Sequence, residues 1–256
     1  MFDFNGKAVL VTGGTRGIGR GIAEAFLAAG AQVAICGRTD PESLPDHQAR
    51  TAQFFAADVR DATQAASAVE SAYERFGRLD VLVNNAGGSP PAEAATASPR
   101  FSAAIVELNL LGALHCAQRA NALMQQHDSG SIVNIASVSG QRPSPGTAAY
   151  GAAKAGLIHL TKSLAIEWAP KVRVNCVVAG MVRTELAEMH YGDEEGVAAV
   201  AATVPLGRLA EPADIAAACL FLSSDAAAYI TGAELLVHGG GERPAFLAAA
   251  KTGARR

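Results

Sequence analysis

Short apolar runs alternate along the chain with longer amphipathic stretches. The short runs, such as VLVNN and SIVNIAS, are apolar at successive positions and do not alternate with polar residues. Strands of a parallel sheet are buried on both faces, so this pattern favours a parallel sheet covered by helices. The predicted strands are residues 7–12, 32–36, 53–57, 79–84, 131–136, 173–178 and 234–237.

Helical patterns fill most of the intervals between these strands. The predicted helices are residues 17–29, 62–76, 100–126, 149–168 and 212–222. The interval TDPESLPDHQAR at residues 39–50 has two prolines and few apolar residues. Because Pro45 would disrupt a helix interior, we expect a loop or a single helical turn there. The whole pattern predicts an α/β fold: a Rossmann-type, doubly wound, parallel seven-stranded sheet in a single domain.

Composition narrows the class of protein. The 256 residues are 50% hydrophobic and 18% charged, which suits a folded domain. A formal net charge of −3 and a pI of about 6.1 give no electrostatic reason to expect a nucleic acid or membrane partner. The N-terminus does not read as a secretory signal and no apolar run is long enough to span a membrane, so we expect a cytoplasmic protein. Four scattered cysteines are typical of reduced core residues, and six histidines without ligand spacing predict no metal site.

The first predicted strand leads directly into a glycine-rich turn, GGTRGIG. Gly13, Gly17 and Gly19 would let the backbone turn tightly and approach a pyrophosphate, whose charge then lies at the positive end of the next helix. The spacing differs from the general G-x-G-x-x-G fingerprint, and a glycine-rich turn alone is a weak signal. Its place between the first strand and the first helix favours a dinucleotide site over a purely structural turn.

The end of the second strand bears on the choice of dinucleotide. An NAD site needs an acidic side chain there to accept hydrogen bonds from the ribose 2′-hydroxyl, but the strand ends in Gly37-Arg38 and the first carboxylate is Asp40. Arg38 would attract a 2′-phosphate, and Arg16 could supply a second positive charge. NADP(H) is therefore favoured over NAD(H). The alternative is that Arg38 is a solvated surface residue.

A tyrosine and a lysine stand four positions apart in the predicted helix 149–168. Tyr150 and Lys154 would share one face of that helix, so the phenol and the ammonium group can point into the same cleft. Ser137 follows the strand SIVNIA, at the carboxyl end of a strand, where open α/β sheets bind their ligands. These three residues are the candidate catalytic set.

Taken together, these motifs resemble the short-chain dehydrogenase/reductase family, and especially its subgroup of β-ketoacyl-carrier-protein reductase-like enzymes. The similarity runs from about residue 5 to residue 241, with the motifs in the family's order and spacing. The motifs are TGGTRGIG, Asp58-Val59, NNAG at residues 84–87, Asn109 in ELNLLG, Ser137, Tyr150-x-x-x-Lys154 and ITGAELLVHGG.

The resemblance implies a role for each catalytic candidate. Tyr150 would give its proton to a carbonyl oxygen during reduction, and Lys154 and an oxidised nicotinamide would lower the phenol's pKa from near 10. Lys154 would also hold the nicotinamide ribose. Ser137 would orient the substrate oxygen, and Asn109 would kink its helix and hold a water that links Lys154 to solvent. Plainer interpretations remain open: Ser137 could merely cap its strand, and Asn109 could be an ordinary polar residue.

The resemblance also implies a set of cofactor contacts. Asp58 and Val59 would contact the adenine, although Asp58 could instead be an acid in a surface turn. In the turn after the sixth strand, where the family usually has Pro-Gly, this chain has Ala179-Gly180. The implied cofactor-binding residues are Gly13, Thr15, Arg16, Gly17, Ile18, Gly19, Arg38, Asp58, Val59, Asn85, Ala86, Gly87, Tyr150, Lys154, Val182 and Thr184.

The C-terminal third completes the prediction. Residues 184–203 would form a substrate lid with an apolar inner face (Leu186, Met189, Tyr191, Val197, Val200) and a mobile break at residues 192–196, while Gln141 and Arg142 could add polar contacts. Residues 1–241 would be the catalytic domain, and 242–256 a tail that either packs at a subunit interface or is disordered. Relatives imply a homotetramer or homodimer.

The function predicted from all of this is hydride transfer between NADP(H) and a ketone or secondary alcohol, with a 3-oxoacyl-type compound as one possible substrate. One alternative is an NAD(H)-preferring dehydrogenase. Another is a non-catalytic nucleotide-sensing module on the same fold, which would be expected to lose Tyr150 or Lys154. A third is a lyase, epimerase or dehalogenase that reuses the Ser–Tyr pair without transferring hydride.

Overall fold

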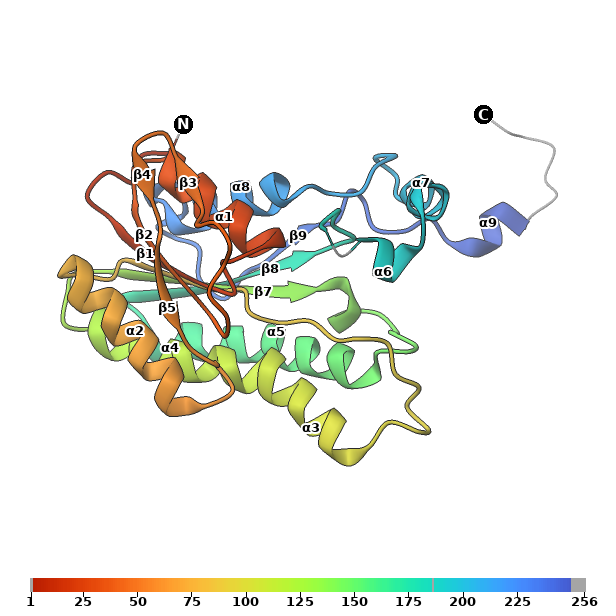
Figure 1. The fold of residues 1–256 in the computed structure, drawn as a ribbon, viewed down its shortest axis with the longest axis horizontal. Coiled ribbons are helices and arrows are strands. Elements are labelled where there is room, and N and C mark those ends of the chain that lie inside the picture. Colours follow the sequence, from red (N-terminus) through yellow and green to blue (C-terminus); the bar gives the residue numbers. More distant parts are fainter. Residues whose placement is uncertain (1, 186, 250–256) are drawn as a thin grey trace.

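A seven-stranded parallel sheet runs through the centre of the computed structural model, which describes residues 2–185 and 187–249 (Figure 1). The strand order is β5-β2-β1-β6-β7-β8-β9, so the chain reverses its direction of winding between β1 and β6. Ligands of such sheets bind at the carboxyl ends of the strands near this reversal. The strands are β1 Ala8–Thr12, β2 Gln32–Gly37, β5 Gln53–Ala56, β6 Val81–Asn84, β7 Gly130–Ser137, β8 Val172–Ala179 and β9 Glu234–Val237.

Helices cover both faces of this sheet (Figure 1). α1 (Gly17–Ala28) and α8 (Pro212–Ser223) lie on one face, and α2 (Ala62–Phe76), α4 (Gly112–Met124) and α5 (Ala148–Trp168) lie on the other. The strands β1, β6 and β7 are buried along most or all of their length, as expected when each face packs against helices. The predicted fold class and the seven predicted strands are therefore confirmed, with ends that differ by one or two residues.

Two segments differ in part from the prediction. The sequence predicts a loop or a single helical turn for residues 39–50; the structure has a loop without a helical turn, and at its end β3 (Asp46–His47) and β4 (Arg50–Thr51) pair as a small antiparallel hairpin. Gln48 makes its turn with a φ of 54°, and the carbonyl oxygen of Pro45 accepts a hydrogen bond from Ala52 N at 2.9 Å. Pro45 disfavours a helix there, but its carbonyl oxygen can still accept the hydrogen bond that closes the two ends of the hairpin. The predicted helix 100–126 is likewise divided into α3 (Pro99–Val106), a π-helical turn (Glu107–Leu111) and α4.

The helices α6 (Ala187–Tyr191), α7 (Glu194–Thr203) and α9 (Ala245–Ala249) lie at one end of the molecule (Figure 1). α6 and α7 are separated by Gly192, whose φ is +84°. Asp193 caps α7, because its side chain accepts a hydrogen bond from Gly196 N at 3.0 Å. After β9 the chain continues past α7 to α9, and Arg243 N donates to Thr203 O at 3.0 Å. Leu186, predicted to line the lid, and residues 250–256 of the predicted tail lie outside the described residues.

Three further findings concern the thiols, possible metal ligands and membrane-spanning helices. All four cysteines are buried and free. Among the described residues, no group of histidine, cysteine, aspartate and glutamate side chains is placed to hold a metal ion. No helix in the same part of the chain has both the length and the apolar character needed to cross a membrane.

Candidate active site

The glycine-rich turn between β1 and α1 brings backbone very close to backbone. A Cβ on Gly19 would lie 2.2 Å from the carbonyl oxygen of Gly13, so no larger residue fits without moving the turn. Gly13 and Gly17 have φ values of 64° and 53°, in the left-handed region that favours glycine. The turn therefore leaves its own backbone open at the start of α1, where the helix dipole favours a negative ligand.

The loop after β6 holds this turn in place. Asn85 donates from its side-chain amide to the carbonyl oxygens of Thr12 (2.9 Å) and Gly13 (3.2 Å). The Thr12 hydroxyl accepts in return from the backbone of Asn85 and Ala86, both at 3.0 Å. Two residues predicted to bind the cofactor, Asn85 and Ala86, are thus bonded directly to the strand end and the turn predicted to hold its pyrophosphate.

Two predicted phosphate-binding arginines lie at the ends of neighbouring segments. Arg16 is exposed and precedes α1 at its N-cap, and Arg38 is exposed at the end of β2. Thr15 and Gly37 bring these two segments together, because a Cβ on Gly37 would lie 3.3 Å from the Thr15 methyl group. Ile18, also predicted to bind the cofactor, is half-buried and packs against the core. The positive charge of Arg38 also helps to lower the pKa of the Asp58 carboxyl group.

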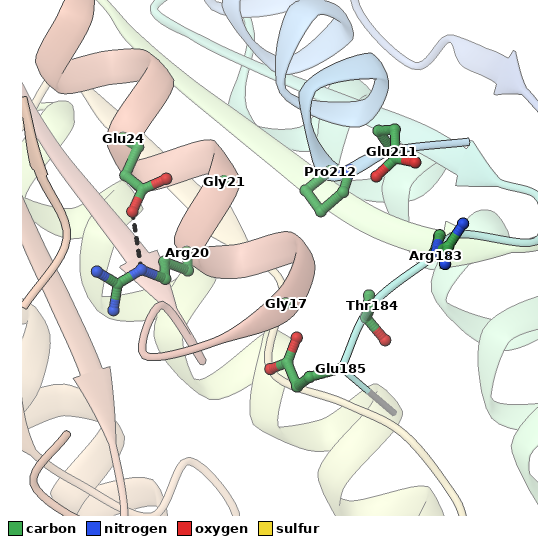
Figure 2. Close-up of a pocket in the computed structure, with 9 residues that line it drawn as sticks. All are labelled: Gly17, Arg20, Gly21, Glu24, Arg183, Thr184, Glu185, Glu211 and Pro212. Carbon is green, nitrogen blue, oxygen red and sulfur yellow. Dashed lines mark hydrogen bonds and ion pairs between the residues drawn. The ribbon is translucent and has the colours of Figure 1, made fainter. Parts of the chain in front are cut away.

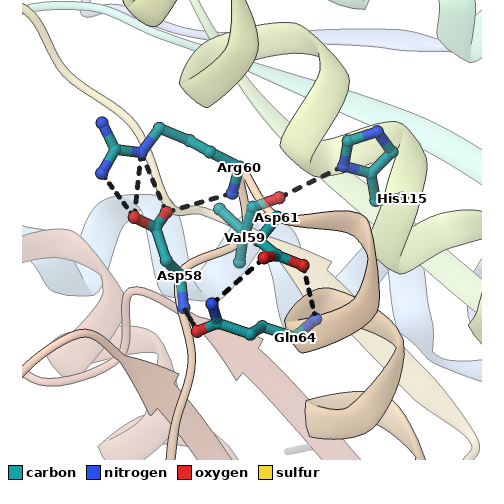
Figure 3. A network of polar contacts seen from close by, with 6 residues as sticks. All are labelled: Asp58, Val59, Arg60, Asp61, Gln64 and His115. Atoms are coloured by element: carbon teal, nitrogen blue, oxygen red, sulfur yellow. Dashed lines mark hydrogen bonds and ion pairs between the residues drawn. The ribbon is translucent and has the colours of Figure 1, made fainter.

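Asp58 is engaged by a residue that the sequence analysis did not single out (Figure 3). Arg60 Nε donates to both carboxylate oxygens at 3.0 Å, and this hydrogen bonding is the main cause of the lowered pKa of Asp58. The D-V-R-D spacing is visible in the sequence, but the spacing does not reveal that the arginine folds back onto the aspartate. Val59 packs against Gly112, and its carbonyl oxygen lies 3.3 Å from His115 Nδ1.

Three predicted catalytic side chains come together at the carboxyl end of β7. Tyr150 and Lys154 lie on successive turns of α5, and Lys154 Nζ is 5.6 Å from the centre of the Tyr150 ring. Ser137 ends β7, and its hydroxyl group acts on the Tyr150 phenol by lowering the pKa of that phenol. The Ser137 hydroxyl also accepts from Ser139 N at 3.1 Å, so the residue caps the next turn as well. The capping interpretation and the catalytic one are compatible.

Burial disfavours the charged forms of both Tyr150 and Lys154, namely the phenolate and the ammonium group. It raises the pKa of Tyr150, against the lowering effect of the Ser137 hydroxyl group. It lowers the pKa of Lys154 to about 8, while Lys154 Nζ donates to the carbonyl oxygen of Ile135 at 2.8 Å. The lowered phenol pKa that catalysis requires is therefore not a property of these side chains alone.

Asn109 lies in the π-helical turn between α3 and α4 and is buried. Its Oδ1 accepts from Gly88 N at 2.8 Å, and its Nδ2 donates to Gly88 O and Ile105 O, both at 2.9 Å. A Cβ on Gly87 would lie 2.7 Å from Asn109 Oδ1 and 3.1 Å from Lys154 Nζ. Asn109, Gly87 and Lys154 therefore meet at one point, and the helix departs from regular α geometry there, as expected.

The segment after β8 faces the glycine-rich turn across a cavity of about 570 Å³ (Figure 2). The Thr184 methyl group and Glu185 Oε2 lie 3.5 and 3.7 Å from where a Cβ on Gly17 would be. Val182 is buried and bridges to Ala210, which fixes the start of the segment. The cavity includes Thr184, which the sequence predicts as a cofactor contact, and also Glu185 and Arg20, which the sequence does not predict. The cavity is lined by Gly17, Arg20, Gly21, Glu24, Arg183, Thr184, Glu185, Glu211 and Pro212.

Comparison with known proteins agrees with this geometry. A family model described as enoyl-(acyl carrier protein) reductase matches residues 13–242. The chain is 38% identical to an uncharacterised oxidoreductase of Mycobacterium tuberculosis over 94% of each chain. It is 37% identical to the 3-oxoacyl-(acyl-carrier-protein) reductase FabG of Escherichia coli, over 93% of this chain and 98% of that one.

A solved structure extends the match to three dimensions. The crystal structure of a putative short-chain alcohol dehydrogenase from Sinorhizobium meliloti superposes with a TM-score of 0.87 at 38% identity, covering 93% of this chain and 97% of that chain. Family model, relatives and solved structure agree over nearly the whole length of the chain. The chain belongs to the short-chain dehydrogenase/reductase family of oxidoreductases.

Proposed function

We propose that this oxidoreductase transfers a hydride between NADP(H) and a small ketone or secondary alcohol. The observation that carries the proposal is the convergence of Ser137, Tyr150 and Lys154 at the carboxyl end of β7, where Lys154 Nζ lies 5.6 Å from the centre of the Tyr150 ring. A nicotinamide dinucleotide fits the site, because Gly17 lines the cavity at the start of α1 without a side chain, and the helix dipole there favours a phosphate group. When bound, the cofactor supplies or accepts the hydride.

The side chains would divide the rest of the chemistry between them. Ser137 hydrogen-bonds the substrate oxygen and fixes its position, and Tyr150 gives that oxygen its proton during reduction. In the reverse reaction, a positive charge near the phenol must overcome the burial that raises its pKa. Lys154 lies within 5.6 Å of the Tyr150 ring centre and supplies part of that charge. Asn109, beside Lys154, would hold the water that links it to solvent.

The preference for NADP(H) rests on Arg38 and Arg16, the two exposed arginines beside the expected position of the ribose 2′-phosphate. Replacing Arg38 by Asp should shift the ratio of kcat/KM for NADPH over NADH toward NADH, because a carboxylate repels the phosphate and accepts from a 2′-hydroxyl. An unchanged ratio would contradict the assignment and favour the alternative of an NAD(H)-preferring dehydrogenase.

The remaining parts of the proposal concern substrate, assembly and location. Residues 1–241 form the catalytic domain, with residues 184–203 as the substrate lid and 242–256 as a tail. A 3-oxoacyl compound is one candidate substrate, supported by the similarity to a 3-oxoacyl-(acyl-carrier-protein) reductase. We further propose a cytoplasmic homotetramer or homodimer.

The decisive test follows NADPH absorbance against a panel of ketones. Tyr150→Phe should abolish turnover while leaving the Kd for NADPH within about twofold, because the phenol's proton is lost and little else changes. Tyr229→Phe is the matched control, since Tyr229 is fully exposed. NADPH binding without turnover of any ketone by the unmodified protein would instead favour a nucleotide-sensing module.

A further inference from the structure

The loop after Ser137 is tied to the C-terminal part of the chain by two adjacent side chains. Gln141 Nε2 donates to Glu234 Oε2 at 2.8 Å, at the start of β9. The next residue, Arg142, forms an ion pair through its Nη2 with Oε1 of Glu242, beyond the end of β9. The two residues of this pair are 100 positions apart, so the fold, and not local sequence, brings them together.

The Arg142–Glu242 pair lies beside the lid. Tyr191, the last residue of α6, is half-buried, and the charges of both Glu242 and Arg142 act on its phenol. Tyr191 in turn acts electrostatically on Tyr150. The loop after β7 lies directly beside the catalytic residues, because Arg142 N donates to Val138 O at 3.1 Å, and a Cβ on Gly151, next to Tyr150, would lie 2.8 Å from Ser139 O.

The ion pair is held by a chain segment that is itself anchored. Leu206 N donates to Gly239 O at 3.1 Å and Arg243 N donates to Thr203 O at 3.0 Å, so bonds on both sides of Glu242 fix its backbone against the end of α7. The side chains of Arg142 and Glu242 nevertheless remain 42% and 35% exposed. An ion pair this open to water contributes little to stability, so another carboxylate can replace Glu242 at the guanidinium group.

We propose that Arg142 selects oxo acids as substrates, because its guanidinium group binds the substrate carboxylate. When no substrate is bound, the guanidinium group is paired with the Glu242 carboxylate instead. The inference rests on the proposed function, since it names the substrate class of the same site. An arginine suits this task because its planar fork donates two parallel hydrogen bonds to a carboxylate. The substrate's ketone would lie at Ser137 and Tyr150, and its carboxylate at the mouth of the cleft beside Tyr191.

The test compares a series of oxo acids with their methyl esters, which keep the carbon skeleton and lack the charge. Arg142→Gln should raise KM for the preferred oxo acid by roughly tenfold or more and leave KM for its ester within about twofold. Glu242→Gln should lower KM for the acid severalfold, because the competing carboxylate is gone, with no change for the ester. Lys7→Gln, which removes the ion pair of the partly exposed Lys7 with Asp80 and does not touch this loop, is the control and should change neither.

Each other outcome is informative. Equal effects of Arg142→Gln on acid and ester would overturn the inference and leave the pair as a structural latch between loop and C-terminal segment. So would an unmodified enzyme that prefers the esters. If the unmodified protein reduces neither acids, esters nor other ketones with NADPH or NADH, the proposed function itself fails. Circular dichroism of each variant shows that the fold is intact.

Discussion

Lys154 holds its ammonium group where burial disfavours a charge. Its pKa falls from 10.5 to about 8, because burial outweighs the favourable charge interaction with Cys176. In the unfolded chain the pKa returns to its ordinary value, so between pH 8 and 10.5 the unfolded state binds more protons than the folded one. The folded state therefore gains stability from Lys154 as the pH rises through this window.

This sign gives a measurable prediction for the cofactor-free protein. The free energy of unfolding of the unmodified chain, relative to Lys154→Met, should increase by about 2 kcal/mol between pH 7 and pH 9.5. Urea unfolding at a series of pH values measures the difference. Lys162→Met, which changes an exposed lysine on the same helix, should show no such trend. A relative stability that is flat or falls over this range would show that Lys154 is not charged and buried at neutral pH.

Residue identities at the site were largely predictable, and their partners were not. Tyr150, Lys154 and Ser137 follow from helix spacing and from their place at a strand end. Arg60 and Glu185 were missed, because their importance lies in contacts with Asp58 and with the glycine-rich turn that spacing does not encode. The positive charge of Arg38 could be predicted from the sequence, but its effect on the pKa of Asp58 is visible only in the folded structure.

At the scale of the elements, the proposed role of α6 and α7 as a substrate lid can be tested directly. Val197 is buried within α7, while Ala198 beside it is exposed. Val197→Ala should change KM and the order of preference among ketones, because it removes apolar volume from the lid. The Kd for NADPH should remain within about twofold, and Ala198→Ser should leave both quantities unchanged. A weakened affinity for NADPH in Val197→Ala, measured by fluorescence titration, would contradict the lid assignment.

The boundaries of two elements could not be predicted from local sequence patterns. The helical pattern of residues 100–126 is continuous, yet Asn109 bonds to Gly88 on a different loop, at the π-helical turn between α3 and α4. Residues 46–51 have no apolar alternation, and their hairpin forms through backbone bonds and one left-handed residue. Both departures arise from contacts outside the local sequence window.

At the scale of the whole molecule, the alternation of strands and helices was enough to predict the sheet. Parallel strands joined by helices have few allowed arrangements, which explains why the fold class could be derived without knowledge of any contact. For the chain beyond β9, the sequence pattern does not distinguish an interface from a disordered tail. In this structure the segment is bonded to its own molecule at Glu242 and Arg243, through Arg142 and Thr203, while Phe246 and Leu247 of α9 are exposed.

Removal of the segment beyond Gly241 tests how this segment is attached to the rest of the molecule. A chain that ends at Gly241 lacks Glu242 and α9. It should keep its oligomeric state in solution and its melting temperature within a few degrees, because the removed segment is bonded to its own molecule through an exposed ion pair and a backbone hydrogen bond. Its KM for oxo acids should fall as in Glu242→Gln. Light scattering and thermal unfolding measure the first two quantities. A smaller assembly after truncation would place the tail in a subunit interface.

The burial of all four thiols has a practical consequence. Burial raises the pKa of Cys36 and of Cys176 to about 12, so neither offers a reactive thiolate near neutral pH. Cys116 and Cys219 are also buried, with their thiol pKa raised for the same reason. A maleimide dye should therefore leave the native chain unlabelled and mark only an introduced cysteine. Ala198→Cys on α7 and Tyr229→Cys, both exposed positions, would form a donor–acceptor pair that reports lid movement by energy transfer.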